Sequence, residues 1–129
     1  MSRIIYLLLI ISFAFFGCEK EPGEGGQASI TGRLYVYKYN GNCTELRDEY
    51  YGVDERVYII AGDEPSHFDD VRTGPDGTFW FPYLRKGKYK IYAISKNCDI
   101  PGQDEAVFLN VEITERKQDV VTENLEIIK

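Results

Sequence analysis

A stretch of turns and alternating apolar residues at positions 71–95, VRTGPDGTFWFPYLRKGKYKIYAIS, constrains the fold of this chain most strongly. Asp76-Gly77 is a strong hairpin signal, because Gly supplies a positive φ and Asp can hydrogen-bond its own backbone. The sequence therefore predicts a central hairpin here, entered by a short strand over residues 68–72, and a second turn at residues 85–88. Pro82 cannot donate a ladder hydrogen bond, so its strand ends there or lies at a sheet edge.

Strand periodicity assigns side chains to faces, because successive residues of a strand point to opposite sides of the sheet. In the central stretch, the residues predicted to point inward are Phe79, Phe81, Leu84, Tyr89, Ile91 and Ala93. The same parity turns Trp80 and Tyr92 outward.

Further strands are predicted over residues 29–39, 57–61, 106–114 and 120–128, whereas residues 40–55 are polar and predicted as a loop. The last two of these strands are expected to form a closing hairpin. Their inward residues would be Ile30, Gly32, Leu34 and Val36 in the first, Val107, Leu109, Val111 and Ile113 in the third, and Val121, Leu125 and Ile127 in the last. About seven short strands separated by turn signals predict a single all-β sandwich.

The pattern Asp76-Gly77-x-Phe79-x-Phe81, then Leu84, then Gly87-x-Tyr89-x-Ile91-x-Ala93 resembles the carboxypeptidase regulatory-like domain. That family is a transthyretin-like or immunoglobulin-like β-sandwich, and the resemblance extends over most of residues 28–129. It implies a structural module without catalytic residues of its own, so it bears on fold more than on function.

The N-terminus has the features of an export signal. Arg3 is followed by the apolar run of residues 4–16, which is too short for an ordinary membrane span. The run ends in Gly17-Cys18, which resembles the lipobox of bacterial lipoproteins. This resemblance implies a signal peptide at 1–17 and an acylated Cys18 as the mature N-terminus. The alternative is an ordinary secretory signal with a cysteine nearby by chance.

The segment after Cys18 is predicted to be a tether. Residues 18–27 include the Gly-rich run PGEGGQ, which favours a flexible spacer, with the folded domain at 28–129. Glu19-Lys20-Glu21 is similar to the acidic signal that places some lipoproteins on the cell surface. We therefore expect an outer-membrane lipoprotein of the cell envelope, facing the periplasm or the cell exterior.

Two cysteines remain if Cys18 is acylated. Cys43 and Cys98 both follow predicted core strands in an exported chain, so we expect a disulfide between them. The bond would close a loop of about 55 residues and stabilise the fold by about 3–4 kcal/mol on the chain-entropy model. Two free thiols or a metal pair are the alternatives, and the second lacks further Cys or His residues at ligand spacing.

Composition and motifs argue against several functions. The formal net charge of −6 argues against nucleic acid as a partner. His67 is the single histidine, and the chain contains neither a G-x-S-x-G nor an H-E-x-x-H motif, so no enzyme activity or cofactor is expected.

A group of acidic residues could bind Ca²⁺; it comprises Asp63, Glu64, Asp69, Asp70 and Asp76. Their spacing matches no calcium-binding loop, and a solvated acidic loop is favoured. No metal site is therefore predicted.

Aromatic residues beyond the predicted core are the main candidates for binding. The outward set is Trp80, Tyr92, Tyr58, Tyr35 and Tyr37, with Tyr39 continuing the stripe. Exposed Trp and Tyr are typical of binding surfaces for protein or for sugar rings. The alternative is that these rings only pair across strands on a solvated sheet face.

These features predict a non-catalytic envelope lipoprotein that docks on a larger membrane or surface assembly. The alternative is a lipoprotein that binds a glycan or another ligand on one aromatic face carrying Trp80 and Tyr92.

The lipid anchor is tested by Cys18→Ala, because removing the thiol removes the site of acylation. We expect the variant to lose partitioning into the detergent phase after Triton X-114 extraction. A variant that still partitions like the parent protein would contradict the anchor.

Overall fold

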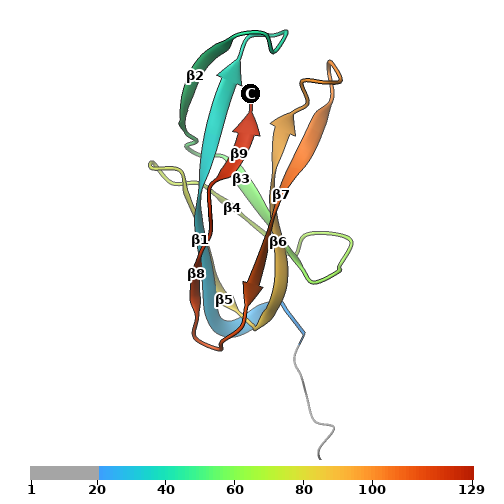
Figure 1. Cartoon of the computed structure of the whole chain (residues 1–129). Helices are drawn as coiled ribbons and strands as arrows, with labels where there is room; N and C mark the ends of the chain where they lie inside the picture. The colour runs from blue at the N-terminus through green and yellow to red at the C-terminus, as the bar shows by residue number, and fades with distance from the viewer. Residues whose placement is uncertain (1–20) are drawn as a thin grey trace, which may run out of the picture.

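The computed structural model describes residues 21–129, and in these residues two β-sheets face each other, as Figure 1 shows. The predicted all-β sandwich is confirmed. The described residues form no helix of the length and hydropathy needed to cross a membrane. Nine strands make up the two sheets: β1 (Glu24–Tyr39), β2 (Leu46–Tyr51), β3 (Arg56–Ala61), β4 (Asp69–Arg72), β5 (Thr78–Leu84), β6 (Gly87–Lys96), β7 (Asp104–Ile113), β8 (Asp119–Val121) and β9 (Leu125–Ile128).

The long strand β1 organises the first sheet. Its first half pairs with β5, which is antiparallel to it, and with β8, which is parallel to it. Its second half pairs with β2, which is antiparallel, and with β9, which is parallel. The second sheet has the order β4-β3-β6-β7, with all neighbours antiparallel. Every strand of the first sheet therefore depends on β1 for its backbone hydrogen bonds.

The core lies between the two sheets, where the inward residues of both meet. All six residues predicted inward from the central stretch are at most 1% exposed. The inward residues predicted for β1 are also buried, as are Val111, Ile113, Leu125 and Ile127. Val107 and Leu109 are partly buried and pack on the core.

The structure has more strands than the predicted seven. The segment predicted as a polar loop over residues 40–55 contains β2, which carries no apolar alternation because all its residues but the half-buried Tyr51 are exposed. The last predicted strand is split into β8 and β9, and this break changes the parity. Val121, predicted inward, is 78% exposed, and Val120 packs on the core instead.

The two predicted hairpins are wrong. The turn at Asp76-Gly77 joins β4 of the second sheet to β5 of the first, and residues 85–86 lead back to β6 of the second sheet. The expected closing hairpin is likewise a crossover, because β7 pairs with β6 whereas β8 and β9 pair with β1. Period-two alternation identifies strands and their buried faces. It does not tell whether two consecutive strands pair in one sheet or cross between the sheets, because their inward residues reach the same core in both cases.

The local chemistry of the turn matches the prediction. Gly77 has φ +79°, and Asp76 Oδ1 accepts a hydrogen bond of 3.1 Å from the Thr78 amide. Hydrogen bonding to the Thr78 side chain, followed by hydrogen bonding to the Thr78 backbone, lowers the pKa of the Asp76 carboxyl. β5 begins at Thr78 and pairs with β1 alone among the described strands, so Pro82 lies in an edge strand as expected.

The predicted flexible tether over residues 18–27 is wrong for its second half. β1 already begins at Glu24, and a Cβ at Gly26 would approach the Leu84 carbonyl oxygen to 2.0 Å. The glycines here allow close backbone contact rather than flexibility. The predicted signal peptide, the lipidated Cys18 and the first residues of the tether lie outside the described residues.

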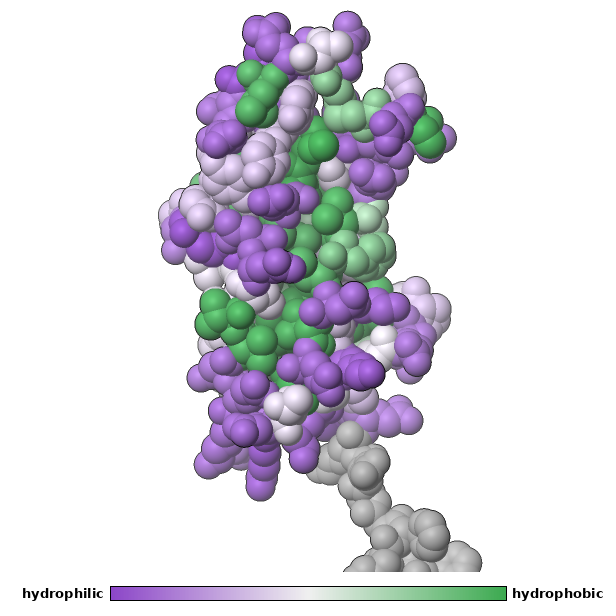
Figure 2. Space-filling view, viewed as in Figure 1, coloured by the Kyte–Doolittle hydropathy of each residue, from purple (hydrophilic) through white to green (hydrophobic). Residues whose placement is uncertain are grey.

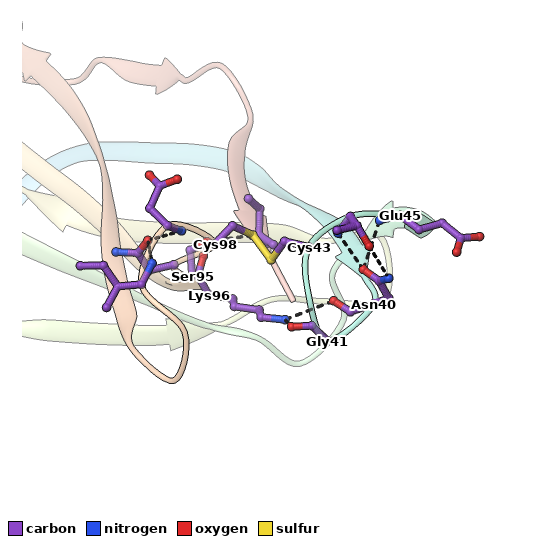
Figure 3. Close-up of a disulfide and its surroundings, with 12 residues drawn as sticks. Asn40, Gly41, Cys43, Glu45, Ser95, Lys96 and Cys98 are labelled. Atoms are coloured by element: carbon purple, nitrogen blue, oxygen red, sulfur yellow. Dashed lines mark hydrogen bonds between the residues drawn. A yellow bond between two sulfur atoms is a disulfide. The ribbon is translucent and has the colours of Figure 1, made fainter.

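The predicted disulfide between Cys43 and Cys98 is confirmed, as Figure 3 shows. It joins the β1–β2 turn to the β6–β7 loop, with 5.7 Å between the two Cα atoms. Lys96 Nζ reinforces the same junction by donating to the carbonyl oxygens of Asn40 and Gly41 at 3.3 and 3.0 Å. This end of the sandwich is therefore closed by covalent and polar links.

Gly77→Val should destabilise the domain by about 1–3 kcal/mol, because a β-branched residue at positive φ is strained. The new Cβ would also lie 2.9 Å from the Tyr51 Cβ and 3.0 Å from the Leu34 carbonyl oxygen. Gly41→Val is the control, since a Cβ there meets nothing within 4 Å. Urea unfolding measures both, and equal stability of the two variants would contradict this account of the turn.

Candidate functional site

The five aromatic residues predicted to bind lie on opposite outer faces of the sandwich. Trp80 on β5 lies opposite Thr31 of β1, so it shares the outer face of the first sheet with Tyr35 and Tyr37. Tyr58 and Tyr92 project from the outer face of the second sheet. The predicted single face carrying Trp80 and Tyr92 is therefore wrong, because the chain crosses between the sheets from β5 to β6.

An aromatic row crosses three strands of the second sheet. Tyr58 of β3, Tyr92 of β6 and Phe108 of β7 are direct cross-strand neighbours. The rings of Tyr58 and Tyr92 are stacked with centroids 4.7 Å apart and an interplanar angle of 11°, and the Phe108 centroid is 5.3 Å from that of Tyr92. We call these three residues the aromatic row.

His67 adds a polar contact to the aromatic row. Its Nδ1 lies 3.1 Å from Tyr92 Oη, and its ring is edge-on to Tyr58 with centroids 4.8 Å apart. Partial burial, followed by the nearby Tyr58 and Asp70, raises the pKa of Tyr92. The Tyr92 hydroxyl therefore stays protonated at neutral pH.

Apolar and charged neighbours border the aromatic row. Phe108, at one end of the row, is 51% exposed, and its apolar neighbour Ile94, two residues after Tyr92 on β6, is 47% exposed. On the other side, Asp70 lies opposite Tyr58 and forms a salt bridge of 3.8 Å with Arg56. The outer face of the second sheet thus has an exposed apolar centre with a charged border.

Three tyrosines form a second cluster on the first sheet, which we call the tyrosine face. The Tyr35 ring is edge-on to those of Tyr37 and Tyr51, with centroids 5.2 and 4.9 Å apart. The hydroxyls of Tyr35 and Tyr37 donate to Oε1 of Glu49 and Glu126, each at 3.2 Å. Partial desolvation and these carboxylates raise the pKa of both tyrosines.

Arg33 links the tyrosine face to the turn before β5. Its Nε and an Nη donate to the Asp76 carbonyl oxygen at 3.0 and 2.8 Å. The guanidinium carbon is 3.4 Å from the centroid of the Tyr51 ring, a cation–π arrangement. Arg33 is thus fixed between the turn and the rings.

Trp80 lies further along the outer face of the first sheet and is 55% exposed. It lines a shallow depression of about 360 Å³ together with Tyr83 and Pro82. Thr31 separates it from the exposed Val121 of β8. Figure 2 shows hydrophobic surface over β8 and alongside β7, with hydrophilic side chains toward both ends of the molecule.

No metal centre is formed by the described residues. Among residues 21–129, no three His, Cys, Asp or Glu side chains converge in a geometry that could hold an ion. The acidic residues around His67 are instead spread over a loop and β4, and Asp76 belongs to the turn before β5.

Several residues of these clusters were missing from the predicted set. Phe108 could have been found by parity, because Val107 and Leu109 on either side were placed inward. Tyr51 and Glu49 belong to β2, which has no apolar alternation to mark it as a strand. The neighbourhood of His67 and Tyr92 depends on how the β3–β4 loop folds over the sheet, and no local signal indicates it.

Glu49→Gln should lower the pKa of Tyr35, because the Glu49 carboxylate accepts a hydrogen bond from the Tyr35 hydroxyl and disfavours its ionisation. Because the pKa of Tyr35 is higher in the folded state than the value of 10.0 in the unfolded state, Tyr35 stabilises the fold at pH values below 10.0. This stabilisation is lost as the pH rises through the pKa of the folded state. Alkaline unfolding of the parent should therefore follow this ionisation. NMR titration of the tyrosine Cζ measures the pKa, and Glu45→Gln serves as a distant control; a Tyr35 pKa unchanged by Glu49→Gln would contradict the contact.

Comparisons with known proteins assign no family. No protein-family model matches this chain, and no curated protein matches it in sequence. Among solved structures, it is similar to the crystal structure of a "putative carbohydrate binding protein" from Pseudomonas aeruginosa, with 14% identity, a TM-score of 0.47, and coverage of 83% of this chain and 91% of that one. At this level, the likeness assigns neither a function nor a ligand to this chain.

Proposed function

We propose that this protein is a non-catalytic lipoprotein of the cell envelope that docks onto another envelope protein through the aromatic row. The single observation that carries the proposal is the exposed apolar centre on the outer face of the second sheet. A solvated sheet face is ordinarily polar, and contiguous exposed apolar side chains there are typical of interaction sites.

The geometry of the aromatic row suits a protein partner. Tyr58 and Tyr92 are already stacked, so binding would cost little side-chain entropy. Phe108 and Ile94 offer apolar area to be buried, and the Arg56–Asp70 pair supplies a polar border. An aromatic centre with a polar rim is the usual anatomy of a protein interface.

A non-catalytic role is supported by the surroundings of the only histidine. His67 Nδ1 contacts the hydroxyl of Tyr92, a side chain with a raised pKa, rather than a Ser or Cys nucleophile. Catalysis of the triad type would need a base beside a nucleophile and a third group that orients the base. The proposal accordingly includes neither a substrate nor a cofactor.

The envelope location rests on the N-terminal sequence. The lipobox-like Gly17-Cys18 would place acyl chains at the start of the mature protein in the outer membrane. Glu19-Lys20-Glu21 favours exposure on the cell surface. The disulfide at the other end of the fold is consistent with an oxidising compartment.

The tyrosine face supports a second candidate function, glycan binding. Aromatic rings stack against the C–H faces of sugars, and carboxylates beside them can accept hydrogen bonds from sugar hydroxyls. Tyr35, Tyr37 and Tyr51 provide such rings, with Glu49 and Glu126 beside them. Trp80 on the same sheet face provides a fluorescent reporter.

Paired variants on the two faces discriminate the candidates. The full-length lipidated protein is crosslinked in its native membrane, captured, and its partners are quantified by mass spectrometry. Tyr92→Ser with Phe108→Ser should reduce recovery of a stoichiometric partner by about tenfold, the equivalent of about 1.4 kcal/mol. Tyr35→Ser with Tyr37→Ser is the matched control on the opposite face and should leave recovery unchanged.

Retention of the partner by the Tyr92 and Phe108 variant would contradict docking through the aromatic row. A saturable shift of Trp80 fluorescence with a soluble glycan, lost in the Tyr35 and Tyr37 variant, would instead establish the second candidate. A partner lost equally in both variants would point to general destabilisation, and urea unfolding of each variant detects this.

A further inference from the structure

The chain is fastened to one end of the sandwich before β1 begins. The Arg85 side chain donates from Nε to the Glu21 carbonyl oxygen at 2.7 Å, and its backbone amide donates to the Gly23 carbonyl oxygen at 2.8 Å. The Gly23 amide donates to Tyr89 Oη at 2.8 Å, and that hydroxyl donates to the Arg85 carbonyl oxygen at 2.6 Å. Burial raises the pKa of Tyr89, so it remains a donor at neutral pH.

Close packing holds the same segment in place. Pro22 lies so near Gly87 that a Cβ at position 87 would come within 2.2 Å of Pro22 Cγ. Gly23 is buried, and Gly26 passes directly against the backbone of Leu84. We call residues 21–23 with Arg85 and Tyr89 the N-terminal latch.

The N-terminal latch limits how far this end can lie from an anchor on Cys18. Cys18 and Glu21 are three residues apart in the sequence. A fully extended chain spans at most about 3.6 Å per residue, so the distance between them is at most about 11 Å. A lipid on Cys18 would therefore hold this end of the sandwich against the bilayer surface.

The two chain segments that form the tip of this end are rich in basic residues. Two segments lie together here, because Gly87 is the register partner of Ile113: residues 85–88, which are a turn and the first two residues of β6, and the turn of residues 114–118. We call these two segments the basic turns. The two turns contain one acidic residue, Glu115, and five basic residues: Arg85, Lys86, Lys88, Arg116 and Lys117. All of the basic residues but the half-buried Arg85 are exposed, and none of the five forms a salt bridge with a carboxylate of residues 21–129.

The charge is uneven along the molecule. Acidic residues border the two turns, namely Glu21, Glu24, Glu112 and Asp119, so this end is close to neutral, whereas the whole chain has a net charge of −6. At the opposite end, the turns 40–45 and 97–103 contain Glu45 and Asp99 and no Lys or Arg. Figure 1 shows the start of the described chain at the lower end, and the C-terminus at the upper end.

We propose that the end formed by turns 85–88 and 114–118 docks on the phosphate headgroups of the membrane. This inference rests on the lipid anchor of the proposed function. Lysine and arginine within a Debye length, about 8 Å, of an anionic surface are attracted to it, while the acidic remainder of the chain is repelled. The domain then stands upright, with the disulfide end directed away from the bilayer and both outer sheet faces accessible from the side.

Paired fluorescent reporters test the orientation. In a Trp80→Phe background, Tyr83→Trp places a reporter beside the N-terminal latch and Ile100→Trp places one in the loop at the disulfide end; the parent residues are 70% and 47% exposed. The lipidated proteins are reconstituted in phosphatidylcholine vesicles with and without phosphatidylglycerol, containing a lipid with a nitroxide on its headgroup. We expect quenching of the Tyr83→Trp reporter to be several-fold stronger, with the difference largest when phosphatidylglycerol is present.

Charge reversal tests the role of the basic turns. Lys86→Glu with Lys117→Glu should reduce the difference between the two reporters in phosphatidylglycerol vesicles. Lys38→Glu with Arg47→Glu is the matched control, with the same change of charge at exposed positions away from these turns, and should leave the difference intact. Raised salt should act like the first pair, because it screens the attraction.

The outcomes separate this inference from the anchor on which it rests. Protein that does not float with the vesicles contradicts the lipid anchor itself. Protein that floats but shows equal quenching of the two reporters contradicts the upright orientation alone. A difference that neither phosphatidylglycerol nor charge reversal alters would contradict the role of the phosphates and leave the N-terminal latch as the sole source of orientation.

Discussion

The backbone pairing of β1 is the constraint on which the rest of the structure depends. This strand supplies the hydrogen bonds of β2, β5, β8 and β9, so the first sheet would have no centre without it. Its inward residues are all buried, and one of them has to be glycine. A Cβ at Gly32 would lie 2.4 Å from Phe79 Cζ, which shows how tightly β5 packs on β1. The alternation of inward and outward residues along β1 thus positions the side of the core that the first sheet contributes.

The crossovers between sheets decide where chemistry can occur. Because the chain passes from β4 to β5 and back to β6, neighbouring aromatic residues in the sequence are sent to opposite sides of the molecule. The aromatic row is apolar with a charged border, whereas the tyrosine face combines rings with Glu49, Glu126 and Arg33. The two faces therefore favour different partners, a protein surface and a glycan, and neither requires the other.

The two ends of the sandwich are as different as its two faces. One end is closed by the disulfide and by Lys96, and the other by the N-terminal latch with its basic turns. In each case, loops that join different strands are tied to one another, which limits opening at the ends of the sheets, where backbone hydrogen bonds are most exposed. A lipid anchor at the end with the N-terminal latch would place that end at the membrane and the disulfide end away from it.

The sequence by itself determined the strands with clear alternation, their buried faces, the turn at Asp76-Gly77 and the disulfide, because each rests on parity, on backbone chemistry close in sequence or on cysteine count. Only the tertiary structure decided which strands pair, because an alternating strand can bury the same face in either sheet. β2 could not be predicted, since its side chains are exposed and its stability comes from pairing with β1. The close packing of residues 22–26 was equally hidden, because glycines allow flexibility and close packing alike. Only the positions of Leu84 and Gly87 against these residues select close packing.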